Sequence, residues 1–331
     1  MTTAIGIDIA KDKFDVAVQV DNAQPQMAAF ENNPKGFKAC HVFLKRANAY
    51  PGHVCMEATG VYYEELAHFL HQAGYPVSVI NPLQISGYAH SRLRRNKTDR
   101  LDAALLVDFV RTQSPPLWTP PEPSWYELRS LVRHLEDLES DRQRQRNRRD
   151  AIRHSAQPSA IVLTNLDAQI AFLTDQIKQI KGAIQHHIDQ HPALKQSHEL
   201  LDSIKGIGTL TASKLLAECG DMSQFDDVRQ LVAFAGLNPQ HHLSGSSVRG
   251  KTHISKIGNA SIRAALYMPA VNAKRFNTLL QPFIARLEQR GLCDMEIVTA
   301  IMRKLLHLAY GILKSGRPFD PDFLQSRLST P

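Results

Sequence analysis

Four carboxylates in the first third of the chain have the types and spacing that suit metal chemistry. Asp8 lies in an alternating β-branched stretch, and Glu57 ends a second short apolar stretch. Asp99 and Asp102 are three residues apart, so their side chains share one face if the segment is helical. Carboxylates that converge from strand ends and a helix start bind hard cations such as Mg²⁺ or Mn²⁺. Two such ions about 4 Å apart can hold the attacking and leaving oxygens of a phosphodiester.

Each of these acids also has a simpler interpretation. Asp99 suits a helix N-cap, Asp102 is a favourable charge in a first helical turn, and Glu57 is an ordinary residue for a strand end. Asp8 is the exception, because an acid flanked by isoleucines in a strand is unfavourable unless it has a partner. Spacing alone therefore leaves a metal site and a structural role equally open.

A second group of reactive side chains lies in the segment HHLSGSSVRGK, residues 241–251. A serine hydroxyl there could act as a nucleophile, provided that a base, a metal or an electropositive pocket activates it. Ser and Gly are equally typical of a solvated loop. Nearby cations are suitable donors to charge on a phosphoryl group. The serines are Ser244, Ser246 and Ser247, which chemistry alone does not rank, and the cations are Arg249, Lys251, Lys256 and Arg263.

Three further segments are candidates for contacts with a phosphate backbone. The runs SRLRRNK and RQRQRNRR concentrate positive charge, although such a run is often only a solvated helix face. The segment KGIGTLTASKLL has two glycines between helical patterns, as in helix-hairpin-helix elements, where backbone N–H groups hold a phosphate. A plain tight turn explains it equally well. The residues concerned are Arg92, Arg94, Arg95, Lys97, Gly206 and Gly208, together with the run Arg142–Arg149.

Composition narrows the class of protein. The chain has 331 residues, 43% of them hydrophobic and 21% charged, as in ordinary globular proteins. Its net charge of +7 favours a polyanionic partner such as nucleic acid. No apolar run approaches the roughly 18 to 20 residues that span a bilayer, and no signal peptide is evident. The four cysteines form no CxxC pair, so we expect a reduced, cytoplasmic setting without a membrane.

The acids fall within elements typical of an α/β domain. The alternation in residues 3–20 predicts two strands joined near residues 10–13. A strand at 53–58, a helix closed by Gly74, and a strand at 76–82 then predict a parallel pair with a helical crossover. A helix that Thr98 or Asp99 can cap is then expected to continue through Val110.

Helical patterns dominate the rest of the chain. A helix is expected over 126–154, after a Pro-rich segment that looks like a linker or an ordered crossing. The next helix has apolar residues at alternating spacings of three and four, which predicts a coiled coil over 158–192 that joins protomers. We therefore expect three domains, at 1–157, 158–192 and 193–331. The seam residues are Leu163, Leu166, Ile170, Leu173, Ile177, Ile180 and Ile184.

Seven segments, in order along nearly the whole chain, resemble the insertion-sequence transposases with a DEDD motif, the IS110 group, which are relatives of the DNA invertase Piv. They are GIDIAKDKFDVAV, MEATGVYYEELA, VSVINP, RNKTDRLDA, AFAGLNP, SGSSVRGKTHISKIGNASIRAALYMPA and MRKLLHLAYGILKSG.

That resemblance implies a RuvC-like, RNase H-type first domain, followed by a coiled coil and a mainly helical transposase domain with the serine segment. It implies that Asp8, Glu57, Asp99 and Asp102 bind Mg²⁺, and that Ser244 forms a phosphoserine with DNA. Ser246 and Ser247 would then shape the loop or contact phosphate. It further implies a homo-oligomer, dimer to tetramer, whose active sites combine acids and serine from different subunits. Its partners would be donor and target DNA and a guide, the bridge RNA of the same element.

Three other functions remain open at this point. A Holliday-junction nuclease would use metal-activated water and leave Ser244 without a role. A sugar-kinase or actin-like ATPase also has a strand like GIDIA, although a second phosphate loop is not evident in the sequence. A DNA-binding regulator would need none of the acids.

Overall fold

The computed structural model describes residues 3–93, 99–222, 225–240, 243–244, 248–249 and 253–321; of residues 99, 100, 243, 244, 248 and 249 it describes the backbone alone. The chain divides into two compact units, Met1–Pro120 and Pro121–Pro331. The division falls earlier than the expected boundary at residue 157, because the helix that precedes residue 157 packs with helices of the second unit. Each unit is described here by itself.

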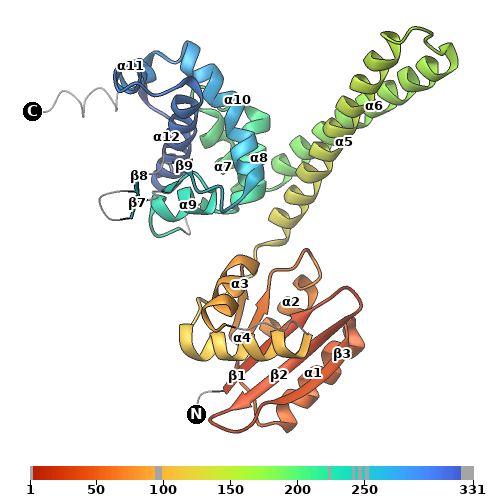
Figure 1. The fold of residues 1–331 in the computed structure, drawn as a ribbon, viewed down its shortest axis with the longest axis vertical. Coiled ribbons are helices and arrows are strands. Elements are labelled where there is room, and N and C mark those ends of the chain that lie inside the picture. Colours follow the sequence, from red (N-terminus) through yellow and green to blue (C-terminus); the bar gives the residue numbers. More distant parts are fainter. Residues whose placement is uncertain are drawn as a thin grey trace, which may run out of the picture. The chain divides into compact units, whose positions relative to one another are not determined.

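The first unit is built on a five-stranded mixed sheet with the order β3-β2-β1-β4-β5 (Figure 1). The first three strands pair antiparallel, whereas β1–β4 and β4–β5 are parallel. This confirms the mixed α/β class, and the order is consistent with a RuvC-like fold. The strands are β1 Thr3–Ile9, β2 Lys13–Val20, β3 Gln26–Glu31, β4 His53–Glu57 and β5 Val77–Ile80.

Alternation along the strands divides the sheet into two faces. Ile7 lies opposite Val16 in the β1–β2 pair, so the apolar residues of both strands pack on the same side, beneath α1 and α2. The opposite face carries Gly6 and is covered by α4, with α3 beside it. The first unit therefore has three layers. Its helices are α1 Pro34–Arg46, α2 Glu64–Gln72, α3 Pro82–Ser91 and α4 Asp99–Gln113.

The Pro-rich segment that follows α4 is an ordered crossing along the edge strand β5. The Trp118 N–H donates to the Val77 carbonyl at 2.7 Å, and the Ser78 hydroxyl donates to the Pro116 carbonyl at 2.7 Å. These bonds satisfy polar groups of β5, which among the described strands has no neighbour on its outer side. The crossing belongs to the first unit.

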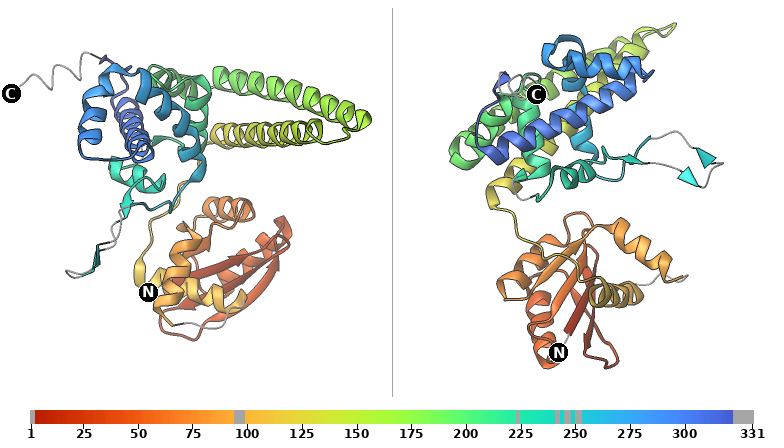
Figure 2. Two further views of the ribbon diagram at one scale, coloured as in Figure 1. Left: turned by 45° about the horizontal axis from the view of Figure 1, so that its top comes forward. Right: turned by 90° about the vertical axis from the view of Figure 1, so that its left-hand side faces the viewer.

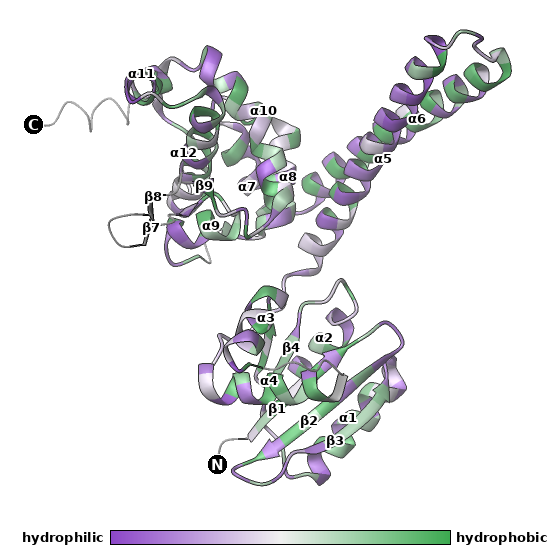
Figure 3. Cartoon of the chain, in the orientation of Figure 1, coloured by the Kyte–Doolittle hydropathy of each residue, from purple (hydrophilic) through white to green (hydrophobic). Residues whose placement is uncertain are grey.

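The second unit begins with two long antiparallel helices, α5 Pro123–Arg153 and α6 Ala160–Gln190 (Figure 1). Their pairing runs from the bond between His187 Nε2 and the Ser124 carbonyl, at 2.8 Å, to the ion pair between Arg149 and Asp167, at 3.1 Å. The apolar seam of α6 is covered by α5 of the same chain, so its expected use between protomers is replaced by an internal contact. Hydrophobic residues recur along α6, whereas the second half of α5 is almost entirely hydrophilic (Figure 3).

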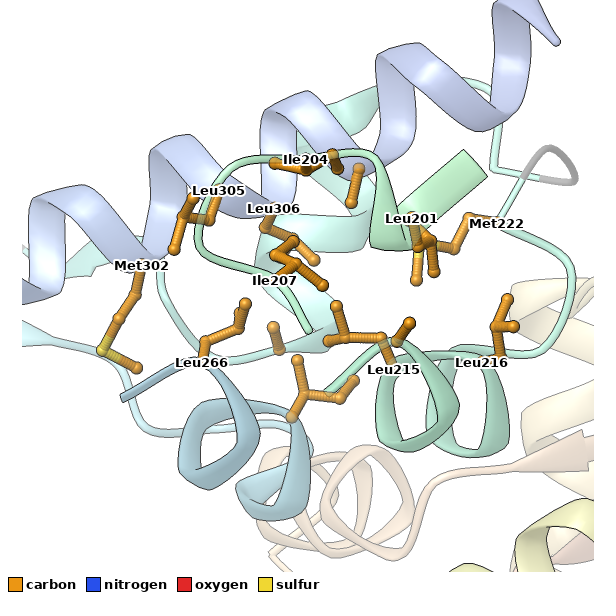
Figure 4. Close-up of a cluster of buried hydrophobic side chains, with 14 of the residues drawn as sticks. Leu201, Ile204, Ile207, Leu215, Leu216, Met222, Leu266, Met302, Leu305 and Leu306 are labelled. Carbon is orange, nitrogen blue, oxygen red and sulfur yellow. The ribbon is translucent and has the colours of Figure 1, made fainter. Parts of the chain in front are cut away.

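The remaining helices pack around one large apolar core, to which α5 and α6 also contribute. Its centre joins residues far apart in sequence, among them Leu201, Ile207, Leu216, Leu266 and Leu306 (Figure 4). The elements are α7 Pro192–Asp202, α8 Thr209–Cys219, α9 Val228–Phe234, α10 Ala260–Phe276, the short 3-10 helix η2 Thr278–Leu280, α11 Gln281–Gln289 and α12 Asp294–Ser315. Within the part of the chain that the structure describes, none of the helices is sufficiently long and apolar to traverse a bilayer.

Four two-residue strands between α9 and α10 form the serine arm, defined here as residues 239–254 (Figure 2). Strands β6 Pro239–Gln240 and β9 His253–Ile254 pair antiparallel at its base. Strands β7 Leu243–Ser244 and β8 Val248–Arg249 pair antiparallel further along it.

A methyl group at Gly6 should disrupt the first unit. A Cβ there would lie 2.1 Å from the Ala103 carbonyl oxygen and 2.7 Å from the Val107 nitrogen, both backbone atoms of α4. Gly6→Ala should therefore lower the free energy of unfolding by about 1–3 kcal/mol or more, measured by urea denaturation. Gly87→Ala in α3 is the matched control: its Cβ meets nothing within 4 Å, so stability should stay equal or rise. Equal unfolding curves for wild type and Gly6→Ala would contradict the described packing.

Candidate active site

Asp8 and Glu57 lie at neighbouring positions of two paired parallel strands. Ile7 of β1 is in register with Met56 of β4, so the next residue on each strand is one of the two acids. Asp8 lies two residues after Gly6, and Glu57 lies two residues after Cys55, so each acid is on the same face of the sheet as that residue. Gly6 and Cys55 face α4. Both are half-buried. The sheet therefore presents two adjacent carboxylates on its α4 face, at the carboxyl ends of the strands.

The other two predicted acids begin the helix that covers this face. α4 starts at Asp99, as the sequence predicted, and its residue Ala103 lies directly against Gly6. Asp102 precedes Ala103 and is half-buried. The close approach at Gly6 thus places the first turn of α4 over the strand that carries Asp8. Among the described side chains, which exclude that of Asp99, no group of three or more His, Cys, Asp or Glu residues is gathered as a metal site.

A fifth carboxylate on this face was overlooked in the sequence. Asp15 of β2 lies directly opposite Asp8 in the β1–β2 register and is only 6% exposed. Lys13 Nζ forms an ion pair with its carboxylate at 3.3 Å. The signal was available, since Asp15 stands between two apolar residues of its strand, Phe14 and Val16, just as Asp8 stands between two isoleucines.

A side-chain amide links the two loops that border the paired acids. Asn32 Nδ2 donates to the Ala10 carbonyl at 3.0 Å, just after β1, and to the Tyr62 carbonyl at 3.1 Å, in the loop that follows β4. In the same loop, the Thr59 hydroxyl donates to Glu57 Oε1 at 3.5 Å. These bonds restrain both strand ends where the acids lie.

The basic run before α4 is only partly described. Arg92 forms an ion pair with Asp108 at 2.9 Å and donates to the Tyr88 hydroxyl, which ties the end of α3 to α4. These contacts raise the pKa of the Arg92 guanidinium, first through the Tyr88 hydrogen bond. The other expected phosphate contacts of this run, Arg94, Arg95 and Lys97, lie outside the described residues.

The second basic run, Arg142–Arg149, is partly paired within the α5–α6 helices. Arg149 contacts Asp150 at 3.4 Å as well as Asp167, and Arg144 pairs with Asp141. This run therefore supplies ion pairs to the helix pair itself.

Ser244 lies in the serine arm of the second unit. Its strand β7 pairs with β8, so that Ser244 is opposite Val248 and Leu243 is opposite Arg249. The arm thus brings Arg249 to the strand next to that of Ser244. Three other predicted residues of the arm, Ser246, Ser247 and Lys251, lie outside the described residues.

The two cations that follow the arm have different surroundings. Lys256 is exposed, and its backbone N–H donates to the Gly236 carbonyl at 3.2 Å. Arg263 is half-buried, and its Nη1 donates to three carbonyls, those of Ala235 at 3.0 Å, Gly258 at 3.3 Å and Asn259 at 3.2 Å. Its guanidinium joins the two chain segments at the root of the arm, a role that the sequence did not reveal.

Gly206 and Gly208 lie between α7 and α8, where the sequence placed them. Gly206 has a φ of +108°, a conformation that favours glycine, and Gly208 is the N-cap residue of α8. Both are exposed, so the start of α8 is open to solvent. The geometry suits both a turn and a phosphate contact.

Comparison with known proteins adds to this geometry. Residues 5–155 match a DEDD transposase model, and residues 198–285 match the model described as transposase IS116/IS110/IS902 family. The pilin gene-inverting protein of Moraxella bovis is 37% identical over 322 residues, which cover 96% of this chain and 98% of that protein. The chain belongs to the IS110 transposase family. A transposase for the element IS1328 of Yersinia enterocolitica is 25% identical over 80% of this chain and 81% of its own length.

Membership makes this protein a transposase or recombinase, an enzyme that acts on DNA. The two matched regions contain the candidate residues of both units: the four acids lie in the first and Ser244 in the second. As an IS110 transposase, the protein distributes its candidate chemistry over the two units.

Loss of the Arg263 guanidinium should destabilise this transposase. Arg263→Met leaves the three carbonyls without their shared donor, so the free energy of unfolding should fall by about 1.5–3 kcal/mol, measured by urea denaturation. Lys256→Met is the control and should change it by less than about 0.5 kcal/mol, because the side chain is exposed. If Arg263→Met weakens DNA binding and leaves unfolding unchanged, Arg263 contacts phosphate instead.

Proposed function

We propose that this protein is a recombinase that cuts and rejoins DNA strands through a covalent phosphoserine at Ser244, with a divalent cation held by Asp8, Glu57, Asp99 and Asp102. The observation that carries the proposal is the pairing of Asp8 and Glu57 at adjacent strand ends, on the face where α4 begins. A purely structural role for both acids would not require them to lie side by side.

The acid face fits a hard cation in its chemistry. Its candidate donors are carboxylate oxygens, which Mg²⁺ and Mn²⁺ prefer over nitrogen or sulfur. Two like charges on neighbouring strands also repel each other, and a cation between them relieves this repulsion. When bound, such an ion supplies positive charge to the oxygens of a phosphodiester.

The covalent bond to the serine would retain the energy of the broken phosphodiester bond. The serine Oγ forms a bond to phosphorus while the bond from phosphorus to the leaving oxygen breaks, and on balance the serine proton passes to that oxygen. The reverse step on another DNA end releases the serine and rejoins the strand without ATP. Arg249, on the strand paired with that of Ser244, supports the proposal because a cation there suits charge on a phosphoryl group.

The partners proposed are donor and target DNA, a guide RNA from the same element, and further copies of this chain, a dimer to tetramer. The net charge of +7 is consistent with nucleic acid. The position of the acids and Ser244 in separate units is compatible with active sites that combine two subunits.

Inversion of a DNA segment is a second candidate outcome of the same chemistry. It is favoured by the 37% identity to a pilin gene-inverting protein over 96% of this chain. Sequencing of the recombined DNA separates the two: an excised or inserted element supports transposition, and a reversed segment between two ends supports inversion.

Ser244→Ala should abolish a covalent protein–DNA adduct. The protein is incubated with Mg²⁺, labelled DNA that carries the sequences flanking its gene, and RNA transcribed from those flanks, then denatured and separated by electrophoresis. Ser247→Ala is the matched control in the same arm and should retain the adduct. Hydrolysed DNA without any adduct would contradict the proposal and support a nuclease that uses water.

Removal of an acid should weaken the response to divalent cations. The wild type should show a rise in Tm with Mg²⁺ or Mn²⁺, which Asp8→Asn and Glu57→Gln should lose, and the adduct yield of both variants should fall at least about a hundredfold. Asp12→Asn, an exposed acid in the β1–β2 turn, should keep both. An unchanged adduct yield in Asp8→Asn would remove the acids from the mechanism.

A further inference from the structure

A buried carboxylate in the second unit connects three elements that are distant in sequence. Glu218, near the end of α8, is only 5% exposed. It accepts hydrogen bonds from Arg133 of α5, at 2.9 Å from Nε and 3.2 Å from Nη2, and from Asn259 Nδ2 at 2.6 Å. Burial by itself would raise the pKa of the Glu218 carboxyl, but its three donors lower the pKa below the ordinary value. The group therefore remains charged and bound.

Asn259 stands at the root of the serine arm. It is the N-cap of α10, and its side-chain oxygen accepts from the Ile262 N–H at 3.2 Å. Its own N–H donates to the Phe234 carbonyl, at the end of α9, at 2.7 Å. The residue therefore holds together the chain that enters the arm, the chain that leaves it, and the helix that follows.

Two glycines show how closely the two chains approach at this root. A Cβ at Gly258 would lie 2.4 Å from the Phe234 carbonyl oxygen, and a Cβ at Gly236 would lie 2.7 Å from Arg263 Nη1. Ser255 adds two bonds to Asn238, from its N–H at 2.9 Å and from its hydroxyl at 2.6 Å. These contacts join the two chains closely at the root. The orientation of the root therefore depends on the groups that bind Asn259.

The helix pair is firmly attached to α8 on the other side of Glu218. Arg129 Nε of α5 donates to the Ala217 carbonyl at 2.9 Å, and Lys214 Nζ lies 3.2 Å from Glu136 of α5. Glu218 is thus bonded both to α5, through Arg133, and to the root of the arm, through Asn259. Breaking either bond would leave a buried polar group unsatisfied.

We propose that Glu218 is a positioning residue, which couples the α5–α6 helix pair to the root of the serine arm and so sets the place of Ser244 for reaction. This role rests on the proposed function of Ser244. The position of Ser244 then depends on the angle of the helix pair. A partner that binds α5 and α6 and fixes this angle therefore also fixes the root of the arm.

Three variants of the full-length chain test the coupling. Glu218→Gln removes the charge that both donors share. Asn259→Ser keeps a helix-capping oxygen and loses the donor to Glu218. Glu136→Gln is the matched control, because it weakens the same α5–α8 contact without touching Asn259.

Amide hydrogen exchange gives a readout that is independent of catalysis. In Glu218→Gln and Asn259→Ser, the N–H groups of Ser255, Lys256 and Asn259 should exchange about tenfold faster, and in Glu136→Gln they should not. Unchanged exchange in Asn259→Ser would overturn the coupling, and this variant also decides the question if Glu218→Gln does not fold.

Adduct formation then tests the positioning role. At saturating DNA, the rate of adduct formation should fall at least about tenfold in Asn259→Ser and Glu218→Gln while DNA affinity stays unchanged. An unchanged rate would overturn positioning. If Ser244→Ala itself retains the adduct, the proposed chemistry fails instead, whereas the exchange result still decides whether Glu218 holds the arm.

Discussion

The first unit depends on the close contact between α4 and the middle of β1. Only a residue without a side chain allows it, because the Ala103 carbonyl oxygen occupies the place of a Cβ at Gly6. This contact sets the height of α4 above the sheet, and with it the distance between the start of α4 and the strand that carries Asp8. The acid pair of β1 and β4 is placed by strand register, while the acids of α4 are placed by this one contact.

In the second unit, the main constraint is how the serine arm is held by the helices at its root. The described strands of the serine arm have two residues each and contribute few backbone hydrogen bonds. Its direction comes from the root, where Asn259, Arg263 and the buried Glu218 bind backbone and side-chain groups on both sides. Charged side chains that sequence reasoning assigns to DNA thus divide into exposed ones, such as Lys256, and ones used by the fold, such as Arg263.

Local sequence patterns predicted much of the fold. They failed for features that depend on contacts between segments distant in sequence. The period of two in β1 and β2, the start of α4 and the length of α6 were visible in sequence. The third strand, α1 and α3 were not anticipated, and the apolar seam of α6 was assigned to a partner subunit although α5 covers it. A heptad pattern shows that a helix has an apolar face, but it carries no information about which chain covers that face.

For the site, the sequence by itself determined which residue types are available and, through seven matching segments, the family to which they belong. Tertiary structure alone decided that Asp8 and Glu57 are neighbours, that Asp15 joins their face, and that Arg263 serves the root of the arm. The physical reason is that spacing along one strand or helix fixes only the face on which a side chain lies. Register between strands and the approach of a helix depend on partners many residues away.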